Sequence, residues 1–243
     1  MRIAVLGAGN IGTTLARRFA GAGHEVRLAN SRGPDTFADV AADVGASAMH
    51  AEDAVRGVDV VVTSTPFSAA PRLEPVLAGA PAHAVLIDTS NYFPGRDGVI
   101  AAVEAGQVES VWVSERIGRP LVKAWNNILQ ASLANRHHPA GHPDRTALSV
   151  AGDDAASKFL AMHLVELTGF DAVDGGPIEE SWRQQPGSPA YTTELTRDAL
   201  LDALARADRE SLPAKREEMA RQVAALNNDS VDDRLRIARD LFL

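Results

Sequence analysis

Short apolar segments alternate along the chain with longer stretches in which apolar residues recur at helical spacing. Short apolar runs bounded by glycine, proline or charged residues are typical of buried strands, and a repeat of three to four residues is typical of helices. The pattern predicts strands at 3–6, 25–29, 58–63, 84–88, 111–113, 121–125, 147–151 and 171–174. It predicts helices at 13–22, 36–44, 51–56, 71–77 and 154–168.

The order of these segments indicates the fold class. Strand and helix alternate as far as residue 174, and this order is typical of an open sheet with helices on both faces. Residues 58–62, Val-Asp-Val-Val-Val, are apolar on both sides of the strand. A strand that is buried on both faces belongs in a parallel sheet, so we predict an α/β protein with a doubly wound, mostly parallel sheet.

The remainder of the chain changes character. Residues 175–191 are rich in proline and glycine, and helical spacing follows, with Leu195, Ala199 and Ala203 four residues apart. Ser230 and Asp233 then form a capping pattern before another helical stretch. We therefore expect a domain at 1–178 and a small helical C-terminal domain at 179–243, which can act as a cap or as a subunit contact.

The composition excludes several kinds of function. The net charge of −8, without a basic stripe, argues against a nucleic-acid partner. The chain has no cysteine, which excludes disulfides, thiolate metal sites and thiol nucleophiles. No apolar stretch approaches the roughly 18 residues of a membrane span. We expect a cytoplasmic protein with no membrane partner.

Three histidines, His137, His138 and His142, lie close together in the sequence. Their segment has the composition of a surface loop, and Asp144 is the carboxylate beside them. We interpret them as surface histidines and expect no metal site.

The beginning of the sequence carries the most specific motif, Gly7-x-Gly9-x-x-Gly12, between a predicted strand and a predicted helix. In this setting Gly7 permits a tight turn, Gly9 lets the backbone approach a pyrophosphate, and Gly12 lets the helix pack close to the strand. The free N–H groups and the dipole at the amino end of the helix favour phosphate. The motif predicts a Rossmann dinucleotide site, and a glycine-rich structural turn is the alternative.

The end of the second predicted strand indicates which dinucleotide is bound. In sites selective for NAD, an acidic residue here takes the ribose hydroxyls. This corner reads Asn30-Ser31-Arg32, with no carboxylate to repel a 2′-phosphate. Ser31 can donate a hydroxyl and Arg32 a planar fork of N–H groups. A charge-assisted hydrogen bond of about 1.5 kcal/mol favours NADP over NAD about tenfold, so the predicted cofactor is NADP(H).

With these motifs the chain resembles the NADPH-dependent coenzyme F420 reductase family and related bacterial dinucleotide-binding oxidoreductases. The resemblance covers roughly residues 1–180 and is carried by four pieces of sequence: Gly-Ala-Gly-Asn-Ile-Gly at 7–12, Asn-Ser-Arg at 30–32, Val-Lys-Ala-Trp-Asn at 122–126, and Val-Ala-Gly-Asp at 150–153 leading to Asp-Gly-Gly-Pro at 174–177. Residues 181–187 and the terminal helices are similar to the broader relatives rather than to the deazaflavin reductases.

The resemblance implies a doubly wound NADP-binding Rossmann domain with a small C-terminal part, in a protein that is often a homodimer. It implies that a small-molecule hydride acceptor or donor lies over the nicotinamide. It places Ser31 and Arg32 on the 2′-phosphate. The residues that it places around the pyrophosphate are Gly9, Asn10, Ile11 and Gly12.

Further candidate contacts to the cofactor follow the later strands, because cofactors bind at the carboxyl ends of parallel strands. Thr65, Pro66 and Phe67 follow the third predicted strand, and we expect Phe67 to pack on the nicotinamide ring. Asn91 follows the fourth, where it can bond the cofactor or order the turn. Asn126 is expected near the nicotinamide.

Two other candidates stay open. Lys123 lies inside a predicted strand, and we assign neither it nor any other residue as catalytic. Trp182, Arg183 and Gln185 can form a wall of the substrate pocket, or Trp182 can anchor the terminal helices to the sheet.

The sequence therefore predicts an NADP(H)-dependent oxidoreductase that transfers hydride between the nicotinamide and a second small substrate, such as coenzyme F420 or a flavin-like acceptor. A short dehydrogenase or imine reductase is one alternative, for which the sequence offers no convincing proton donor. A non-catalytic NADP(H) sensor is another. An open pocket lined by Phe67, Asn126 and Trp182 would favour catalysis, and a filled one would favour sensing.

Overall fold

The structure is a computed structural model that describes residues 1–226 and 230–243. Its main sheet has six parallel strands in the order β3-β2-β1-β4-β5-β6. Their bounds are β1 (Arg2–Leu6), β2 (Glu25–Ala29), β3 (Ser47–Ala48), β4 (Val60–Thr63), β5 (Val85–Asp88) and β6 (Val122–Lys123). The chain moves outward from β1 to β3 and then returns to the other side of β1. The carboxyl ends of β1 and β4 therefore flank the switch point at which open α/β sheets bind ligands.

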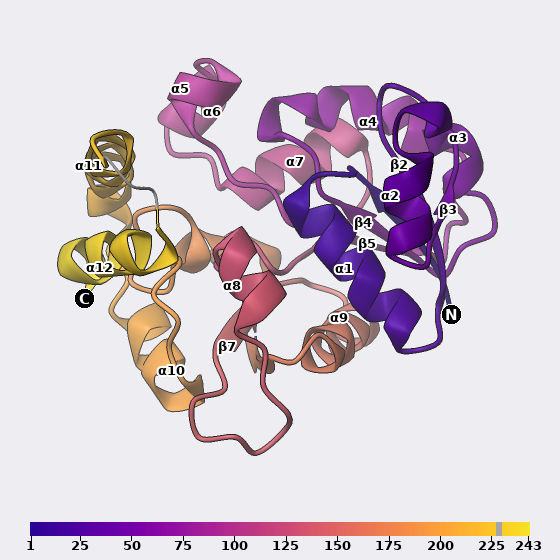
Figure 1. Ribbon diagram of the computed structural model, residues 1–243. Coiled ribbons are helices and arrows are strands. Elements are labelled where there is room, and N and C mark those ends of the chain that lie inside the picture. The colour runs from indigo at the N-terminus through magenta and orange to yellow at the C-terminus, as the bar shows by residue number, and fades with distance from the viewer. Residues whose placement is uncertain (227–229) are drawn as a thin grey trace.

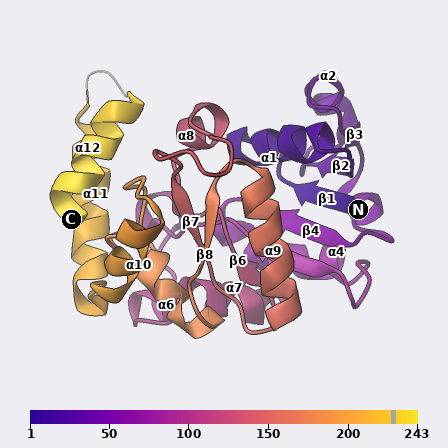
Figure 2. The ribbon, with the colours of Figure 1, turned by 90° about the horizontal axis from the view of Figure 1, so that it is seen from below.

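Helices cover both faces of this sheet, as the sequence predicts (Figures 1 and 2). Alternate residues of β1 face opposite ways: Ile3 and Val5 pack in one apolar cluster, and Ala4 and Leu6 in another. The first cluster is covered by α1 (Asn10–Gly21), α2 (Ala38–Asp43) and α9 (Ala155–Leu167). The second is covered by α3 (Ala51–Ala54), α4 (Ala70–Leu77) and α7 (Glu109–Ile117). The predicted α/β, doubly wound fold is confirmed.

A second sheet of two parallel strands, β7 (Ala147–Val150) and β8 (Asp171–Asp174), lies beside β6. A single antiparallel bridge between Lys123 and Ala151 joins it to the main sheet. The other described elements are η1 (Pro34–Thr36), η2 (Phe67–Ala69), α5 (Pro94–Asp97), α6 (Ala101–Glu104), α8 (Gln130–Asn135), η3 (Ile178–Gln184), α10 (Arg197–Ala205), η4 (Arg209–Ser211), α11 (Leu212–Ala224) and α12 (Val231–Phe242).

The predicted strand at 111–113 is wrong, because these residues lie inside α7. The run Val-Trp-Val fits a strand or a helix equally well over three residues. Trp112, Val113 and Ile117 share the buried side of the helix, and Gly118 ends it in the left-handed conformation with φ 68°. The short strand β3 is an addition that the sequence pattern does not indicate.

The terminal helices lie at the end of the molecule away from β3 and the N-terminus (Figure 1). Leu200, Ala203 and Leu204 of α10 pack on Ala147 and Val173 of the second sheet. The expected helix N-cap at Ser230 is confirmed, since its hydroxyl accepts a hydrogen bond of 3.1 Å from the Asp233 N–H at the start of α12. The division into domains at residue 178 and the homodimer stay predictions. Among the described helices, none has both the length and the apolar character that crossing a membrane demands.

Candidate functional site

The glycine loop after β1 is shaped by close backbone contacts. Gly7 has φ 120°, and a Cβ there would lie 2.0 Å from the carbonyl oxygen of Ser64. A Cβ on Gly12 would lie 1.9 Å from the carbonyl oxygen of Gly7. A Cβ on Gly9, in contrast, would meet no atom within 4 Å. Gly7 and Gly12 are thus required by the fold itself, whereas Gly9 borders open space that a ligand can approach.

The amino end of α1 faces this open space. Gly9 caps the helix without a side chain, and the first helical bond runs over 2.9 Å from the Thr13 N–H to the Gly9 carbonyl. The backbone N–H groups before Thr13 have no acceptor within the helix. They and the helix dipole suit an anionic group such as a pyrophosphate.

One cavity of about 670 Å³ extends from this loop across the ends of β1, β2 and β4. Gly7 and Gly9 border it, Thr65 and Pro66 line it, and the Asn30-Ser31-Arg32 corner closes it. Other lining residues were not predicted, and three of them are titratable, namely His50, Glu52 and Arg72. A groove with a glycine loop and two arginines can hold a phosphorylated ligand.

Asn30 orders the turn at this corner. Its Oδ1 accepts a hydrogen bond of 2.8 Å from the Arg32 N–H, and its Nδ2 donates to the Thr36 hydroxyl over 3.2 Å. Ser31 and Arg32 stay exposed beside the cavity. Within the described part of the chain, neither the Arg32 nor the Arg72 guanidinium forms a hydrogen bond or an ion pair, so both can receive an anion.

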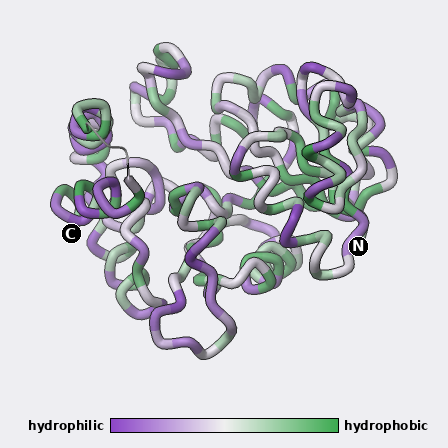
Figure 3. Tube along the Cα trace, in the orientation of Figure 1, coloured by the Kyte–Doolittle hydropathy of each residue, from purple (hydrophilic) through white to green (hydrophobic). Residues whose placement is uncertain are grey.

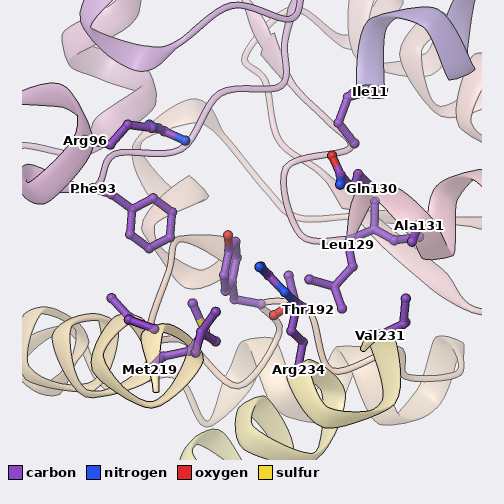
Figure 4. A pocket seen from close by; sticks show the side chains of 15 residues that line it. Ile11, Phe93, Arg96, Leu129, Gln130, Ala131, Thr192, Met219, Val231 and Arg234 are labelled. Atoms are coloured by element: carbon purple, nitrogen blue, oxygen red, sulfur yellow. The ribbon is translucent and has the colours of Figure 1, made fainter. Parts of the chain in front are cut away.

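A second cavity of about 550 Å³ lies on the other side of the glycine loop, between α1 and the terminal helices. Figure 4 shows Ile11 and Gln130 on one side of it, opposite Met219 and Val231. Asn10, beside Ile11, donates a hydrogen bond of 2.6 Å to Gln130. The remaining lining residues are Phe93, Arg96, Ile128, Leu129, Ala131, Tyr191, Thr192, Ala220, Val223, Ala224 and Arg234. The wall is mostly apolar, which suits a small organic molecule.

A buried ionic cluster lies below this edge of the sheet. The Lys123 ammonium donates to Asp88 Oδ2 over 2.6 Å and to the Ser90 carbonyl, and its side chain is fully buried. The Thr63 hydroxyl donates to the other Asp88 oxygen over 3.0 Å. Burial raises the pKa of nearby Glu109 to about 7, although the Lys123 charge opposes this rise. Lys123 therefore neutralises the buried Asp88 carboxylate, and it lines neither cavity.

Asn91 and Asn126 bind each other. Asn91 donates to the Asn126 carbonyl over 2.8 Å, and its Oδ1 accepts from the Asn126 amide over 3.0 Å. Asn126 also donates to the Gln184 carbonyl over 2.8 Å and accepts from the Gln184 amide over 2.7 Å. Both Asn126 amide protons are therefore used inside the protein. The expected nicotinamide contact from Asn126 is wrong, and Asn91 orders the turn.

The expected position of Phe67 is also wrong. Its ring is fully buried and stacks on Trp112 with centroids 4.9 Å apart. Pro66 ends the extended segment and η2 begins at Phe67, so the ring turns into the core below α4 and α7. Trp182 is buried against Val108 and Leu212. It anchors the terminal helices, and it lines neither cavity.

The histidine loop carries no metal cluster among the residues that the structure describes. His138 and His142 stack with ring centroids 4.0 Å apart, and His137 contacts Arg18. Figure 3 shows the loop between α8 and β7 as largely hydrophilic.

Most of the second cavity could not be predicted from the sequence, because its lining comes from six separate segments of the chain. Tyr191 lies at the end of the proline- and glycine-rich stretch at 175–191, but nothing in that stretch indicates which side chain faces a cavity. Arg72 and His50 follow β4 and β3. Because the sequence pattern does not indicate β3, it could not predict that these residues share a cavity with Arg32.

Comparison with known proteins supports the fold and the glycine loop. Protein YjhV of Escherichia coli (strain K12) is 46% identical over 65 residues, which are 27% of this chain and 47% of YjhV. The match thus spans about half the length of that curated relative. The crystal structure of SMa0349 from Sinorhizobium meliloti has a TM-score of 0.68 at 28% identity, covering 82% of this chain and 96% of the other.

A crystal structure from Arthrobacter sp. FB24 superimposes with a TM-score of 0.62 at 23% identity. That protein is described as an F420-dependent NADP-reductase. The alignment covers 94% of this chain and 96% of that protein, and it shows the shared fold. Residues 2–92 match the family model described as NADP oxidoreductase coenzyme F420-dependent. The resemblance drawn from the sequence motifs is confirmed over residues 2–92, which are similar to that oxidoreductase family.

Proposed function

We propose that the chain is an NADP(H)-dependent oxidoreductase that transfers hydride between the nicotinamide and a second small substrate. The observation that carries the proposal is the pair of cavities on the two sides of the glycine loop. One runs from Gly9 to the Arg32 corner, and the other begins at Ile11. A dinucleotide over the loop would place its adenosine in the first cavity and its nicotinamide at the second.

The glycine loop suits the pyrophosphate. The space above Gly9 is open, and the N–H groups at the amino end of α1 lack partners in the helix. In this proposal Gly7 and Gly12 keep the loop against β4 and α1, while Gly9, Asn10 and Ile11 contact the cofactor. NADPH, when bound, supplies the hydride.

Four side chains suit the 2′-phosphate that distinguishes NADP from NAD. Ser31 and Arg32 follow β2, His50 follows β3, and Arg72 approaches from α4. Among the described residues that line the first cavity, Glu52 is the carboxylate, and the two arginines outnumber it. Leu73 and Val76 add an apolar surface for the adenine ring.

The second cavity favours an enzyme over a sensor. It is open, although Phe67, Asn126 and Trp182 do not line it. An assay with NADPH and a panel of acceptors, comprising coenzyme F420, free flavins and ferric chelates together with carbonyl compounds, tests this choice. We expect NADPH oxidation with at least one acceptor, and oxidation with none would favour the sensor.

Binding calorimetry tests the cofactor assignment. We expect Arg32→Ala and Arg72→Ala each to weaken NADPH binding about tenfold or more, since a charge-assisted hydrogen bond contributes about 1.5–3 kcal/mol. NADH, which lacks the 2′-phosphate, should be little affected.

Arg56→Ala is the matched control, because Arg56 is 71% exposed, pairs with Asp53 and lies outside the cavity. This variant should bind NADPH as the unmodified protein does. Equal losses for NADPH and NADH in the Arg32 and Arg72 variants would overturn the assignment.

A further inference from the structure

Tyr191 is a buried tyrosine whose hydroxyl has no hydrogen-bond partner in the part of the chain that the structure describes. It lines the second cavity and is 7% exposed, packed against Ala238 and Phe242 of α12 and 6.5 Å from the Phe93 ring centroid. Among the described residues, nothing forms a hydrogen bond with its hydroxyl. The hydroxyl oxygen is not one of the fully enclosed unpaired atoms of the described residues, so it opens onto the cavity. Buried tyrosine side chains usually find a hydrogen-bond partner for this group, and here a ligand in the cavity can supply it.

The other tyrosine of the chain shows the contrast. The Tyr92 hydroxyl donates to the Gly98 carbonyl and accepts from the Ile100 N–H, each over 3.1 Å. Its hydrogen-bonding capacity is used within the fold. The chain has two tyrosines, so each can be changed while the other serves as control.

The backbone holds Tyr191 in place from both sides. Asn127, just after β6, donates from its side chain to the Ala190 carbonyl over 3.2 Å and accepts at its own carbonyl from the Thr192 N–H over 3.0 Å. Thr192 has φ 54°, a left-handed conformation that is a genuine outlier for a β-branched residue. Strained residues persist where the surroundings fix them, and they cluster at functional sites. The ring of Tyr191 is thus fixed relative to the cavity.

The cavity offers few other acids. Its titratable lining residues in the described part of the chain are Arg96, Tyr191 and Arg234. Arginine does not release its proton in proteins, so Tyr191 is the group of this lining that can donate one and be reprotonated.

Several groups act on this phenol. Burial and the negative charge of Glu109 raise the pKa of Tyr191, so the phenol stays protonated and ready to donate. Arg96 and Arg234 act in the opposite direction and stabilise the anion that remains after donation.

We propose that Tyr191 is the proton donor to a second substrate that carries a polarised carbonyl or imine double bond. This inference rests on the proposed function, because the hydride comes from NADPH. The substrate carbon accepts the hydride while the C=O or C=N π pair moves to the oxygen or nitrogen. That atom takes the Tyr191 phenolic proton. The double bond is reduced, the nicotinamide is oxidised, and water returns a proton to the tyrosinate.

A binding test separates this inference from the proposed function. Unmodified protein, Tyr191→Phe and Tyr92→Phe are first titrated with NADPH, and all three should bind it with affinities within about twofold. Failure of the unmodified protein to bind NADPH would remove the proposed function and this inference together. Binding of NADPH without binding of acetophenone, cyclohexanone or 1-pyrroline to the unmodified protein would overturn this inference alone.

Infrared spectroscopy then tests the hydrogen bond without turnover. Acetophenone is bound in the presence of NADP⁺, which cannot reduce it. We expect its C=O stretch to lie at lower frequency in the unmodified protein and in Tyr92→Phe than in Tyr191→Phe. The same frequency in all three would overturn the proposal.

Turnover completes the test. With NADPH and the same compounds, Tyr191→Phe should lower kcat by roughly 10²–10⁴-fold, the usual contribution of a general acid, with a much smaller change in KM. Tyr92→Phe should retain the kcat of the unmodified protein. An unchanged kcat in Tyr191→Phe would contradict the assignment.

Discussion

Glycines of one motif differ in what they contribute. Gly7 and Gly12 leave no room for a Cβ, because backbone carbonyl oxygens lie 2.0 and 1.9 Å from its position. Gly9 has room for a methyl group and a φ of −85°, which any residue adopts. The sequence motif shows three equal glycines, and the structure separates those that serve the fold from the one that serves a ligand.

This difference predicts opposite outcomes for two alanine variants. Gly9→Ala should fold with nearly unchanged stability and lose most of its NADPH affinity, because the methyl group occupies the proposed pyrophosphate position. Gly7→Ala should be destabilised, by strain at positive φ and by the clash with Ser64. Thermal unfolding and NADPH titration of both variants check this. A Gly9→Ala variant with full NADPH affinity would contradict the proposed cofactor position.

Glu109 makes stability depend on pH. Its pKa is about 7 in the folded protein and near 4.5 in the unfolded chain, because burial disfavours its charge. Between these values the folded state holds a proton that the unfolded state has lost. Stability therefore falls as the pH rises through this window, by on the order of 3 kcal/mol in all.

Replacing Glu109 with glutamine should remove this dependence. The amide oxygen can still accept the hydrogen bond that the Tyr92 N–H donates over 3.1 Å. We expect the free energy of unfolding of Glu109→Gln to stay nearly level from pH 5 to pH 8, and that of the unmodified protein to fall. Urea denaturation at intervals across this range measures both, and parallel curves would refute the argument.

At the scale of elements, the sequence predicted those strands and helices whose positions are set by the spacing of apolar residues. The buried strands β1, β2, β4 and β5 and the helices α1, α4 and α9 appear where the apolar spacing places them. The strand predicted at 111–113 is wrong because three apolar residues fit the spacing of a strand and of a helix equally well. Thr65 and Pro66 line the first cavity, but the turn into η2 reverses the side chain that follows. Such a reversal depends on the core below the loop, which the sequence does not show.

The ends of β5 and β6 are joined by the buried Asp88–Lys123 pair. Removing one partner of such a pair leaves an uncompensated charge and costs about 3–5 kcal/mol. Lys123→Met should therefore lower the free energy of unfolding by roughly this amount. The double variant Asp88→Asn/Lys123→Met should be clearly more stable than the single one. Equal unfolding midpoints for the two variants would show that the charge is not the cause.

At the scale of the whole molecule, the two cavities differ in how far the sequence could predict them. The first is built at the switch point from motifs that carry their own signal, namely the glycine loop and the corner at 30–32. The second joins α1, the segments after β5 and β6, the Tyr191 loop and the terminal helices. No motif spans these pieces, so their meeting depends on the packing of the complete chain.

The wall formed by α11 and α12 has a consequence for how such proteins can diversify. Residues of both helices border the second cavity, and none of their described residues lines the first. On the proposed function, mutation of residues 212–242 would change which compound is reduced while the preferred nucleotide stays the same. Evolution could then alter chemistry in one part of the gene without disturbing the other, and a chimaera carrying a relative's last two helices would inherit that relative's choice of acceptor.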